Sequence, residues 1–509
     1  MTNLGQMRRC SSAVMAVLTA VTLVTAMAGC GHSEAPRSAP SAQPSAPSTP
    51  ATEFATALEG RVTADAMLGH LKKLQEIADA NKGTRALGSP GYAASVDFVA
   101  NALKDKGFDV RTDEFDVRLP FADEPSVTVG GQRVKAAPLL FTIGTPPDGV
   151  SGRLVPANED DTPGCTATDY DELDVSGAIV MVDRGKCPFS EKAAAAAQRG
   201  ALAVIVANND GRDPATGTLG EQTDVKIPVV GISRDEGARL RANPGNATIK
   251  FNAGVRTEHT RNVIAQTKTG STHNVVMAGA HLDSVPEGPG INDNGSGAAA
   301  VLETALQLGS SPQVQHAVRF GFWAGEEEGL EGSTKYVESL DVDELKDIAM
   351  YLNFDMLASP NPGYFTYDGD QSAPPTDSVP RVPEGSAGIE RMLAAYLQGA
   401  GKTPQDTGFD GRSDYDAFTR AGIPAGGLFA GAEEKKTEEQ AKLWGGDANQ
   451  PFDPNYHKNT DTFDHLDRTA LEIQGRGVAY AVGLYAQDEG GRDGVPVRED
   501  RTRHAVPAP

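Results

Sequence analysis

Basic residues are scarce in this chain of 509 residues: lysine and arginine total 46 against 69 acidic residues, giving a formal net charge of −23. A surface of this charge repels phosphate backbones and anionic lipid headgroups. We therefore expect no nucleic-acid partner, and we interpret the acidity as a solubilising surface. Hydrophobic residues are not scarce, at 39%, so the chain can bury the cores of two or three domains.

The N-terminus lacks a hydrophobic run long enough to span a membrane. The basic pair Arg8-Arg9 precedes an apolar run, Ala13 to Ala28, which is shorter than the roughly 20 residues of a membrane helix. The following Gly29-Cys30 resembles a bacterial lipobox, in which the cysteine is lipidated and becomes the mature N-terminus. We predict a signal peptide over residues 1–29, lipidation of Cys30 and extracytoplasmic anchoring in the cell membrane. Cleavage at an ordinary signal-peptidase site would instead give a secreted protein.

Cysteine is also scarce, with four residues in the chain. Cys10 lies within the predicted signal peptide, and Cys30 is the predicted lipid attachment site. In an oxidising compartment, the remaining Cys165 and Cys187 are expected to form one disulfide.

Changes in composition divide the rest of the chain. Prolines among Ser and Ala predict an extended linker over residues 30–52, and a charged stretch with Gly and Pro predicts a disordered tail over 489–509. Helical periodicity and a strand begin an α/β domain at 53–117, whereas 118–255 consists of short β-rich runs with Gly and Pro turns. Strands then alternate with helices over 256–488, the pattern of a mostly parallel sheet with helices on both faces. We predict a smaller β-rich domain inserted into a larger α/β domain.

Polar residues follow the predicted strands of the larger domain. The run Val275 to Ala280 delivers His281 and Asp283, which point to the same side of an extended backbone. Asp293 follows on a Gly-rich turn before an apolar helix. The carboxyl edge of an open α/β sheet is where sites are built, so a metal-binding His281 oriented by Asp283 is one interpretation. A capped strand end and an acidic helix cap are the alternatives.

Further carboxylates follow the next two strands. Ala317 to Ala324 opens onto Glu326-Glu327-Glu328, whose mutual repulsion calls for a cation. Asp355 ends another strand, and His457 lies in a loop rich in Asp and Pro. Spacing alone does not say which glutamate binds metal and which moves protons. Two histidines with several carboxylates suit paired zinc-type ions that share a bridging carboxylate, and the histidines argue against calcium.

Two stretches of the chain resemble known families. From about Thr260 to Gln487 the sequence is similar to the co-catalytic dizinc aminopeptidases of the bacterial leucyl aminopeptidase type, a family that also contains glutamate carboxypeptidases and the inactive transferrin receptor. The motifs that carry this resemblance are Ala280–Ser284, Gly288–Gly297, Trp323–Ser333, Tyr351–Met356, Asn361–Phe365, Asp410–Asp414, Gly426–Phe429 and Tyr456-His457. Residues 118–255 resemble the protease-associated (PA) domain through Asp183–Phe189 and Gly200-Ala201. The resemblance implies the zinc exopeptidase fold, a mostly parallel mixed sheet, with an inserted PA domain.

The resemblance also implies a role for each residue of the motifs. His281, Asp293 and Asp355 would bind one zinc ion. Asp293, as the bridge, would bind the second with Glu327 and His457. The remaining roles are those of Glu326 as general base, Asp283 as the residue that orients a ligand, Tyr456 as hydrogen-bond donor to the oxyanion, Arg412 as part of the substrate site and Glu328 as a dispensable neighbour.

The expected activity is removal of N-terminal amino acids from peptides, with two zinc ions per chain as cofactors. A carboxypeptidase of the same fold is the alternative, in which Arg412 would hold the substrate carboxylate. An inactive binding protein would lack metal ligands, whereas all five and the base are present. Around His457 the bacterial relatives have a disulfide, but Asn455 and Thr460 stand at the corresponding positions here, so the loop must be held otherwise.

Overall fold

The computed structural model describes residues 47–158, 162–209, 211, 213–372, 381–489 and 494–506. The predicted signal peptide, Cys30 and most of the predicted linker lie outside these residues. Among the helices that are described, none has the length and apolar character needed to cross a membrane.

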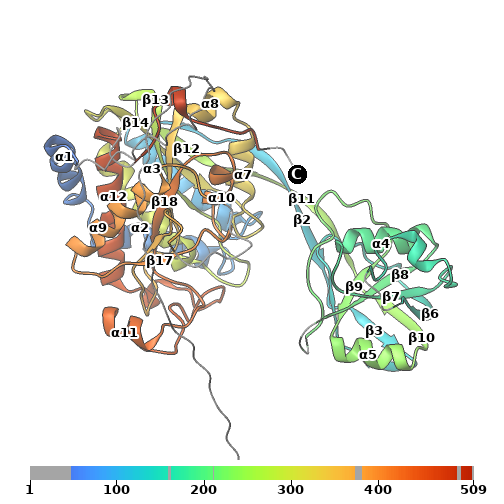
Figure 1. Ribbon diagram of the computed structural model, residues 1–509. Helices are drawn as coiled ribbons and strands as arrows, with labels where there is room; N and C mark the ends of the chain where they lie inside the picture. The colour runs from blue at the N-terminus through green and yellow to red at the C-terminus, as the bar shows by residue number, and fades with distance from the viewer. Residues whose placement is uncertain are drawn as a thin grey trace, which may run out of the picture. The chain divides into compact units, whose positions relative to one another are not determined.

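An eight-stranded sheet forms the centre of the larger domain (Figure 1). Its strands, in spatial order, are β1 (Asp109–Arg111), β12 (Val263–Gln266), β14 (His316–Trp323), β13 (Ser271–His281), β15 (Ile348–Phe354), β18 (Ala425–Phe429), β16 (Phe365–Tyr367) and β17 (Gln405–Thr407). The four central strands, β14, β13, β15 and β18, run parallel, and β12 and β16 pair antiparallel with the outer members of this group. The predicted mostly parallel mixed sheet is confirmed.

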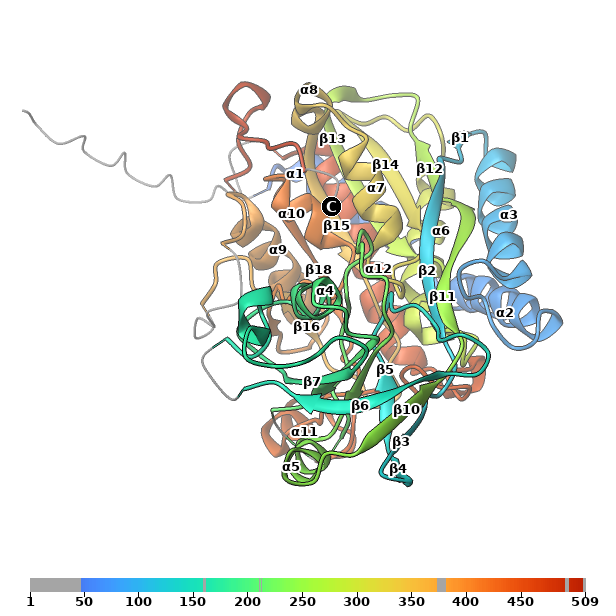
Figure 2. The same ribbon diagram turned by 90° about the vertical axis from the view of Figure 1, so that its right-hand side faces the viewer.

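Helices cover both faces of this sheet, and each face has its own apolar core. One face packs against α2 (Ala64–Ala80), α3 (Pro90–Asp105), α6 (Gly297–Leu308), α9 (Ser386–Gly399) and α12 (Arg468–Gln487), and Figure 2 shows α2 and α3 lying beside each other there. The other face packs against α7 (Glu331–Glu338), α8 (Val342–Asp347) and α10 (Tyr415–Arg420). All seven residues of β15 are buried, as expected for a parallel strand covered on both faces.

Residues 126–250 contain a second eight-stranded sheet, inserted in the chain between β1 and β12. Its strands, in spatial order, are β4 (Gln132–Val134), β3 (Ser126–Val129), β10 (Asn246–Lys250), β6 (Val150–Pro156), β7 (Ile179–Asp183), β8 (Ala203–Ala207), β9 (Val229–Ile232) and β5 (Ala136–Pro138). Helices α4 (Phe189–Gln198) and α5 (Arg234–Ala242) pack on its two faces in separate cores. Cys165 and Cys187 form a disulfide, with Cα atoms 5.9 Å apart.

Two paired strands connect the inserted sheet to the larger domain. β2 (Glu114–Ala122) and β11 (Ala253–Arg261) pair antiparallel along their whole length as a two-stranded ribbon. The single strand predicted within residues 53–117 is therefore two strands in the structure. The chain leaves the larger sheet after β1 and continues in β2, which pairs with β11.

Both described ends of the chain contain structure that the composition did not indicate. Helix α1 (Thr49–Glu59) packs against α12 and begins inside the predicted linker, with Pro50 in its first turn, where the missing N–H is tolerated. Within the predicted disordered tail, residues 494–506 instead lie against the larger domain. There the buried Arg501 and Arg503 donate hydrogen bonds to backbone carbonyls, including those of Lys346 and Leu345.

Candidate metal centre

The carboxyl edge of the larger sheet brings together polar residues from distant parts of the chain. His281 ends β13, Glu326 and Glu327 follow β14, and Asp355 follows β15. Because these strands are parallel, their carboxyl ends share one edge of the sheet. Asp293, on a turn that leads into α6, and His457, on the loop before α12, reach the same place.

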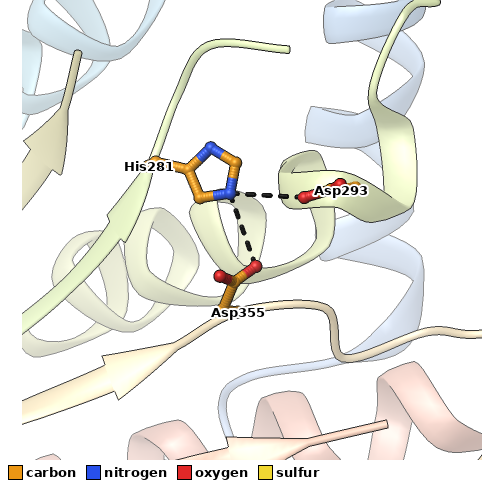
Figure 3. A group of neighbouring side chains, drawn as sticks. All are labelled: His281, Asp293 and Asp355. Carbon is orange, nitrogen blue, oxygen red and sulfur yellow. Dashed lines mark ion pairs between the residues drawn. The ribbon is translucent and has the colours of Figure 1, made fainter. Parts of the chain in front are cut away.

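The Asp293 carboxylate lies between the two histidines. Its Oδ1 atom is 3.3 Å from Nε2 of His281, which is also 3.4 Å from Oδ1 of Asp355 (Figure 3). Its Oδ2 atom is 3.2 Å from Nε2 of His457, which in turn is 3.0 Å from Oε2 of Glu327. Two groups of possible metal ligands therefore share one carboxylate, with one oxygen in each group.

These side chains fit zinc by their chemistry and by their spacing. Several of their buried polar atoms have no hydrogen-bond partner among the described residues: both ring nitrogens of His281, Oδ2 of Asp293, Oε1 of Glu327 and Oδ1 of Asp355. Ligand atoms about 2.0–2.2 Å from a tetrahedral zinc ion lie about 3.3 Å from one another. The measured separations of 3.0–3.4 Å agree with this value.

The electrostatics of the centre favour a bound cation. Burial raises the pKa of Glu327 to about 7, and the nearby charge of Asp293 adds to the effect. Burial likewise raises the pKa of Glu326 well above its usual 4.5. For His457 burial lowers the pKa, but the adjacent carboxylates of Asp293 and Glu327 have the larger, opposite effect, so the pKa is raised from 6.5 to about 10. Clustered carboxylates of this kind are stabilised in their charged form by positive charge.

Asp283 connects one histidine to the pair of glutamates. It is fully buried, and its Oδ1 and Oδ2 accept hydrogen bonds from the backbone amides of Glu326 (3.2 Å) and Glu327 (3.3 Å). Its Oδ1 also lies 3.6 Å from Nδ1 of His281. One carboxylate therefore contacts both the end of β13 and the Glu326–Glu327 segment, a position that partners of metal ligands commonly occupy. The third glutamate of the motif, Glu328, is exposed.

Arg412 and Tyr456 contact each other at the cavity. Nη2 of Arg412 donates hydrogen bonds to the Tyr456 hydroxyl (3.2 Å) and to Oε1 of Glu433 (2.9 Å), and its Nη1 lies 3.5 Å from Glu434. Burial, together with the charge of Asp293, raises the pKa of Tyr456 well above 10, so its hydroxyl remains a proton donor at neutral pH. The Tyr456 ring stacks on His457 at 3.8 Å.

A cavity of about 330 Å³ opens beside these groups. Its lining includes the carboxylates of Asp293, Glu326, Glu327 and Asp355. It also includes large, mainly apolar side chains: Met356, Phe365, Tyr367, Phe429 and Phe452. The cavity therefore combines carboxylates and Tyr456 with a substantial apolar lining.

The structure adds residues for which no role was predicted. Ser413, within a motif singled out only for Arg412, donates a 2.6 Å hydrogen bond to Oδ2 of Asp355. Asp461 accepts hydrogen bonds from the amides of Asn292 (2.8 Å) and Asp293 (3.0 Å), and so ties the His457 loop to the Asp293 turn without a disulfide. The only available signal for Asp461 was its place in the same short loop as His457.

Comparisons with known proteins agree with this geometry. The family model described as peptidase family M28 matches residues 262–482, and the PA domain model matches residues 150–240. The chain is 66% identical to the probable lipoprotein aminopeptidase LpqL of Mycobacterium tuberculosis, over 90% of this chain and 92% of that protein. It is 42% identical to leucine aminopeptidase 2 of Arthroderma otae, over 85% and 86% of the two chains.

Solved structures show the same relationship. An aminopeptidase from Aneurinibacillus sp. strain AM-1 superposes with a TM-score of 0.67 at 27% identity, covering 87% of this chain and 98% of that one. BSAP, a zinc aminopeptidase from Bacillus subtilis, gives 0.58 at 26% identity, covering 85% and 97%. The extent and identity of the match to the mycobacterial relative, together with the family model, show that the chain belongs to peptidase family M28 and contains a PA domain.

Proposed function

We propose that this protein is a zinc-dependent aminopeptidase that holds two zinc ions. One ion would lie among His281, Asp293 and Asp355, and the other among Asp293, Glu327 and His457. The observation that carries the proposal is the position of the Asp293 carboxylate, with one oxygen facing each histidine at 3.3 Å and 3.2 Å. The names of the relatives, which include aminopeptidases and a zinc aminopeptidase, support the same activity.

The residues around the cavity would perform the proton transfers. Bound zinc supplies a Lewis acid that polarises the peptide carbonyl and acidifies water. Glu326, which lines the cavity 4.0 Å from Nε2 of His281, would take a proton from the attacking water and return it to the leaving amine. The Tyr456 hydroxyl would donate a hydrogen bond to the negative oxygen of the tetrahedral intermediate.

The charges at the cavity favour a free amine over a free carboxylate as the recognised end of the substrate. A carboxypeptidase needs a cation that is available to the substrate. Arg412, the candidate from the sequence, already contacts Glu433 at 2.9 Å and Glu434 at 3.5 Å. Lys435 also lines the cavity, but six acidic residues of the lining outnumber these two basic ones. The acidic lining, with Asp355 and Glu434, suits an α-ammonium group, and the apolar side chains suit the first side chain of a peptide.

The proposal extends to the organisation of the whole chain. A signal peptide over residues 1–29 would direct export, and a lipid on Cys30 would anchor the protein outside the cytoplasm. Residues 118–255 would form the PA domain, inserted between the two segments of the peptidase domain, 53–117 and 256–488. The lipoprotein name of the mycobacterial relative supports the anchor. Peptides with free N-termini are the proposed substrates.

The test is hydrolysis of amino-acid p-nitroanilides by protein produced without Cys30 and the residues before it. We expect a chelator to abolish cleavage, zinc to restore it, and Glu326→Ala to abolish it while zinc remains bound. Release of C-terminal residues from N-acetylated peptides, with no p-nitroanilide cleavage, would instead indicate a carboxypeptidase. Failure of the protein to bind zinc would indicate an inactive relative.

A further inference from the structure

A buried arginine outside the candidate ligands contacts the loop that connects two of them. Arg85, on the loop between α2 and α3, is fully buried. Its Nε donates to the carbonyl of Pro289 (2.8 Å), its Nη2 to that of Gly290 (2.5 Å), and its Nη1 to that of Leu282. These carbonyls lie at the two ends of the segment from His281 to Asp293, so one guanidinium joins both ends.

Asp461 binds the same turn by accepting hydrogen bonds from two backbone amides of the turn. Its Oδ1 accepts a hydrogen bond from the amide of Asn292 (2.8 Å) and its Oδ2 from that of Asp293 (3.0 Å). Asp461 is 3% exposed, so both bonds are shielded from water. The short turn Gly290 to Asp293 is therefore held by a guanidinium on its first carbonyl and by a carboxyl group on its last two amides.

The turn requires glycine at its first position. Gly290 has a φ of +61°, and a Cβ at this position would lie 2.3 Å from the carbonyl oxygen of Asp293, 2.4 Å from Cβ of Ser284 and 3.2 Å from Nη2 of Arg85. Any other residue would therefore distort the turn itself, where the guanidinium also packs closely. The Ser284 hydroxyl fixes the other side of the contact, because it accepts from the Arg85 amide (3.0 Å) and donates to the Gly288 carbonyl (2.9 Å).

We propose that Arg85 and Asp461 are positioning residues that hold the Gly290–Asp293 turn so that the Asp293 carboxylate faces both His281 and His457. This inference rests on the proposed function of the site. Buried charges always need partners. Asp461, however, takes both of these amide partners from the one turn that carries the shared carboxylate. Arg85 binds the first carbonyl of that turn, Gly290, together with the carbonyls of Pro289 and Leu282. A displacement of about 1 Å in such a group can reduce the rate of an enzyme by about a hundredfold.

The test uses two conservative variants, Arg85→Lys and Asp461→Asn. A lysine ammonium keeps the charge but cannot reach all three carbonyls in the geometry of the guanidinium fork. Asparagine replaces one acceptor oxygen with an NH₂ group that faces a backbone N–H. We expect folded proteins, judged by circular dichroism, that bind zinc about 10- to 100-fold more weakly in competition with a chromophoric chelator. We also expect an altered visible spectrum of the cobalt(II)-substituted protein, and a lower kcat with little change in KM.

Arg503→Lys is the matched control. Arg503 is also buried, and it donates to the carbonyls of Leu345 (3.2 Å), Gly422 (2.6 Å) and Ile348 (3.0 Å), none of which belongs to the site. We expect this variant to lower the melting temperature without changing the cobalt spectrum or the zinc affinity. The control thus separates a loss of general stability from a loss of ligand geometry.

The following outcomes test the positioning role of Arg85 and Asp461 independently of the proposed aminopeptidase activity. The inference is overturned if Arg85→Lys and Asp461→Asn bind zinc as tightly as the parent and give the parent cobalt spectrum. It is also overturned if Arg503→Lys alters that spectrum to the same degree. Should Arg85→Lys fail to fold, the zinc affinity of Asp461→Asn alone tests the inference: a weaker affinity supports it, and a parent-like affinity overturns it. A parent protein that binds zinc without cleaving p-nitroanilides would contradict the proposed activity but leave this test intact.

Discussion

Asp283→Asn tests how the site is held together, because this carboxylate makes three contacts with two oxygen atoms. It accepts the backbone amides of Glu326 at 3.2 Å and Glu327 at 3.3 Å, and it lies 3.6 Å from Nδ1 of His281. Asparagine has one acceptor oxygen, so at least one of the two amides would face an NH₂ group. The negative charge beside the histidine would also be lost.

The size of the effect follows from these contacts. A hydrogen bond to a charged acceptor contributes about 1.5–3 kcal/mol, and Asp283 is fully buried, so water cannot replace the lost acceptor. Since about 1.4 kcal/mol corresponds to a tenfold change in rate, displacement of the glutamates should lower kcat/KM about 10- to 100-fold. Loss of a carboxylate that orients a metal-binding histidine lowers metal affinity by a similar factor.

The assay is steady-state hydrolysis of an amino-acid p-nitroanilide at saturating zinc, with zinc affinity measured in parallel. Asp341→Asn is the matched control, because Asp341 also accepts a backbone amide, that of Glu344 at 2.8 Å, but caps the distant helix α8. We expect the control to retain parent activity. If Asp283→Asn kept kcat/KM and zinc affinity within twofold of the parent, the assigned role of Asp283 would be refuted.

Three further predictions concern Glu390, Ser413 and the disulfide. Burial raises the pKa of Glu390 from 4.5 to about 7, because the folded protein favours the neutral, protonated side chain. The contribution of this protonated group to the free energy of unfolding is fully present below pH about 4.5 and is lost as the pH rises through 7. In thermal melts Glu390→Gln should therefore be more stable than the parent by about 2 kcal/mol at pH 8 but not at pH 4.5, and equal shifts at both would contradict this. Ser413→Ala removes the 2.6 Å hydrogen bond to Asp355 and should lower zinc affinity about tenfold in a chelator competition; an unchanged affinity would show that this bond does not position the ligand. Replacing Cys165 and Cys187 by serine opens a loop with a sequence separation of 22 residues and should destabilise the inserted domain by about 3 kcal/mol in denaturant melts, whereas p-nitroanilide hydrolysis is expected to persist.

The parts of the fold that could be predicted are those with strong local patterns. The apolar runs that became β13, β14 and β15 are buried on both faces, so each could be recognised without neighbours, and the polar residue after each run marked the sheet edge. Helix α1 was missed because its Pro- and Thr-bearing start resembles a linker, and its burial depends on α12, some 400 residues later in the chain.

The candidate site, like the fold, was predictable only where a local sequence pattern marked its residues. Strand-end positions suggested that the two histidines and several carboxylates form a paired metal site, but only the family resemblance assigned His281, Asp293 and His457 to particular ions, because spacing does not show how loops distant in the chain converge. Spacing also left the two glutamates undistinguished. In the structure both glutamates line the cavity, but Glu327 lies 3.0 Å from His457, whereas Glu326 lies 4.0 Å from His281.

Arg85 gave no signal in the sequence, since its partners are backbone carbonyls about 200 residues away and any residue type can provide a carbonyl. The same reason explains why the contacts of Asp461 could not be predicted. Contacts of this kind are specified by the tertiary fold and not by the residues that are neighbours in the sequence.

The most direct test of the proposed two-zinc centre is a crystal structure of the zinc-loaded protein, with anomalous diffraction data collected on both sides of the zinc absorption edge. We expect two anomalous peaks per chain, one bounded by His281, Asp293 and Asp355 and the other by Asp293, Glu327 and His457. A single peak, or zinc bound away from the Asp293 carboxylate, would contradict it.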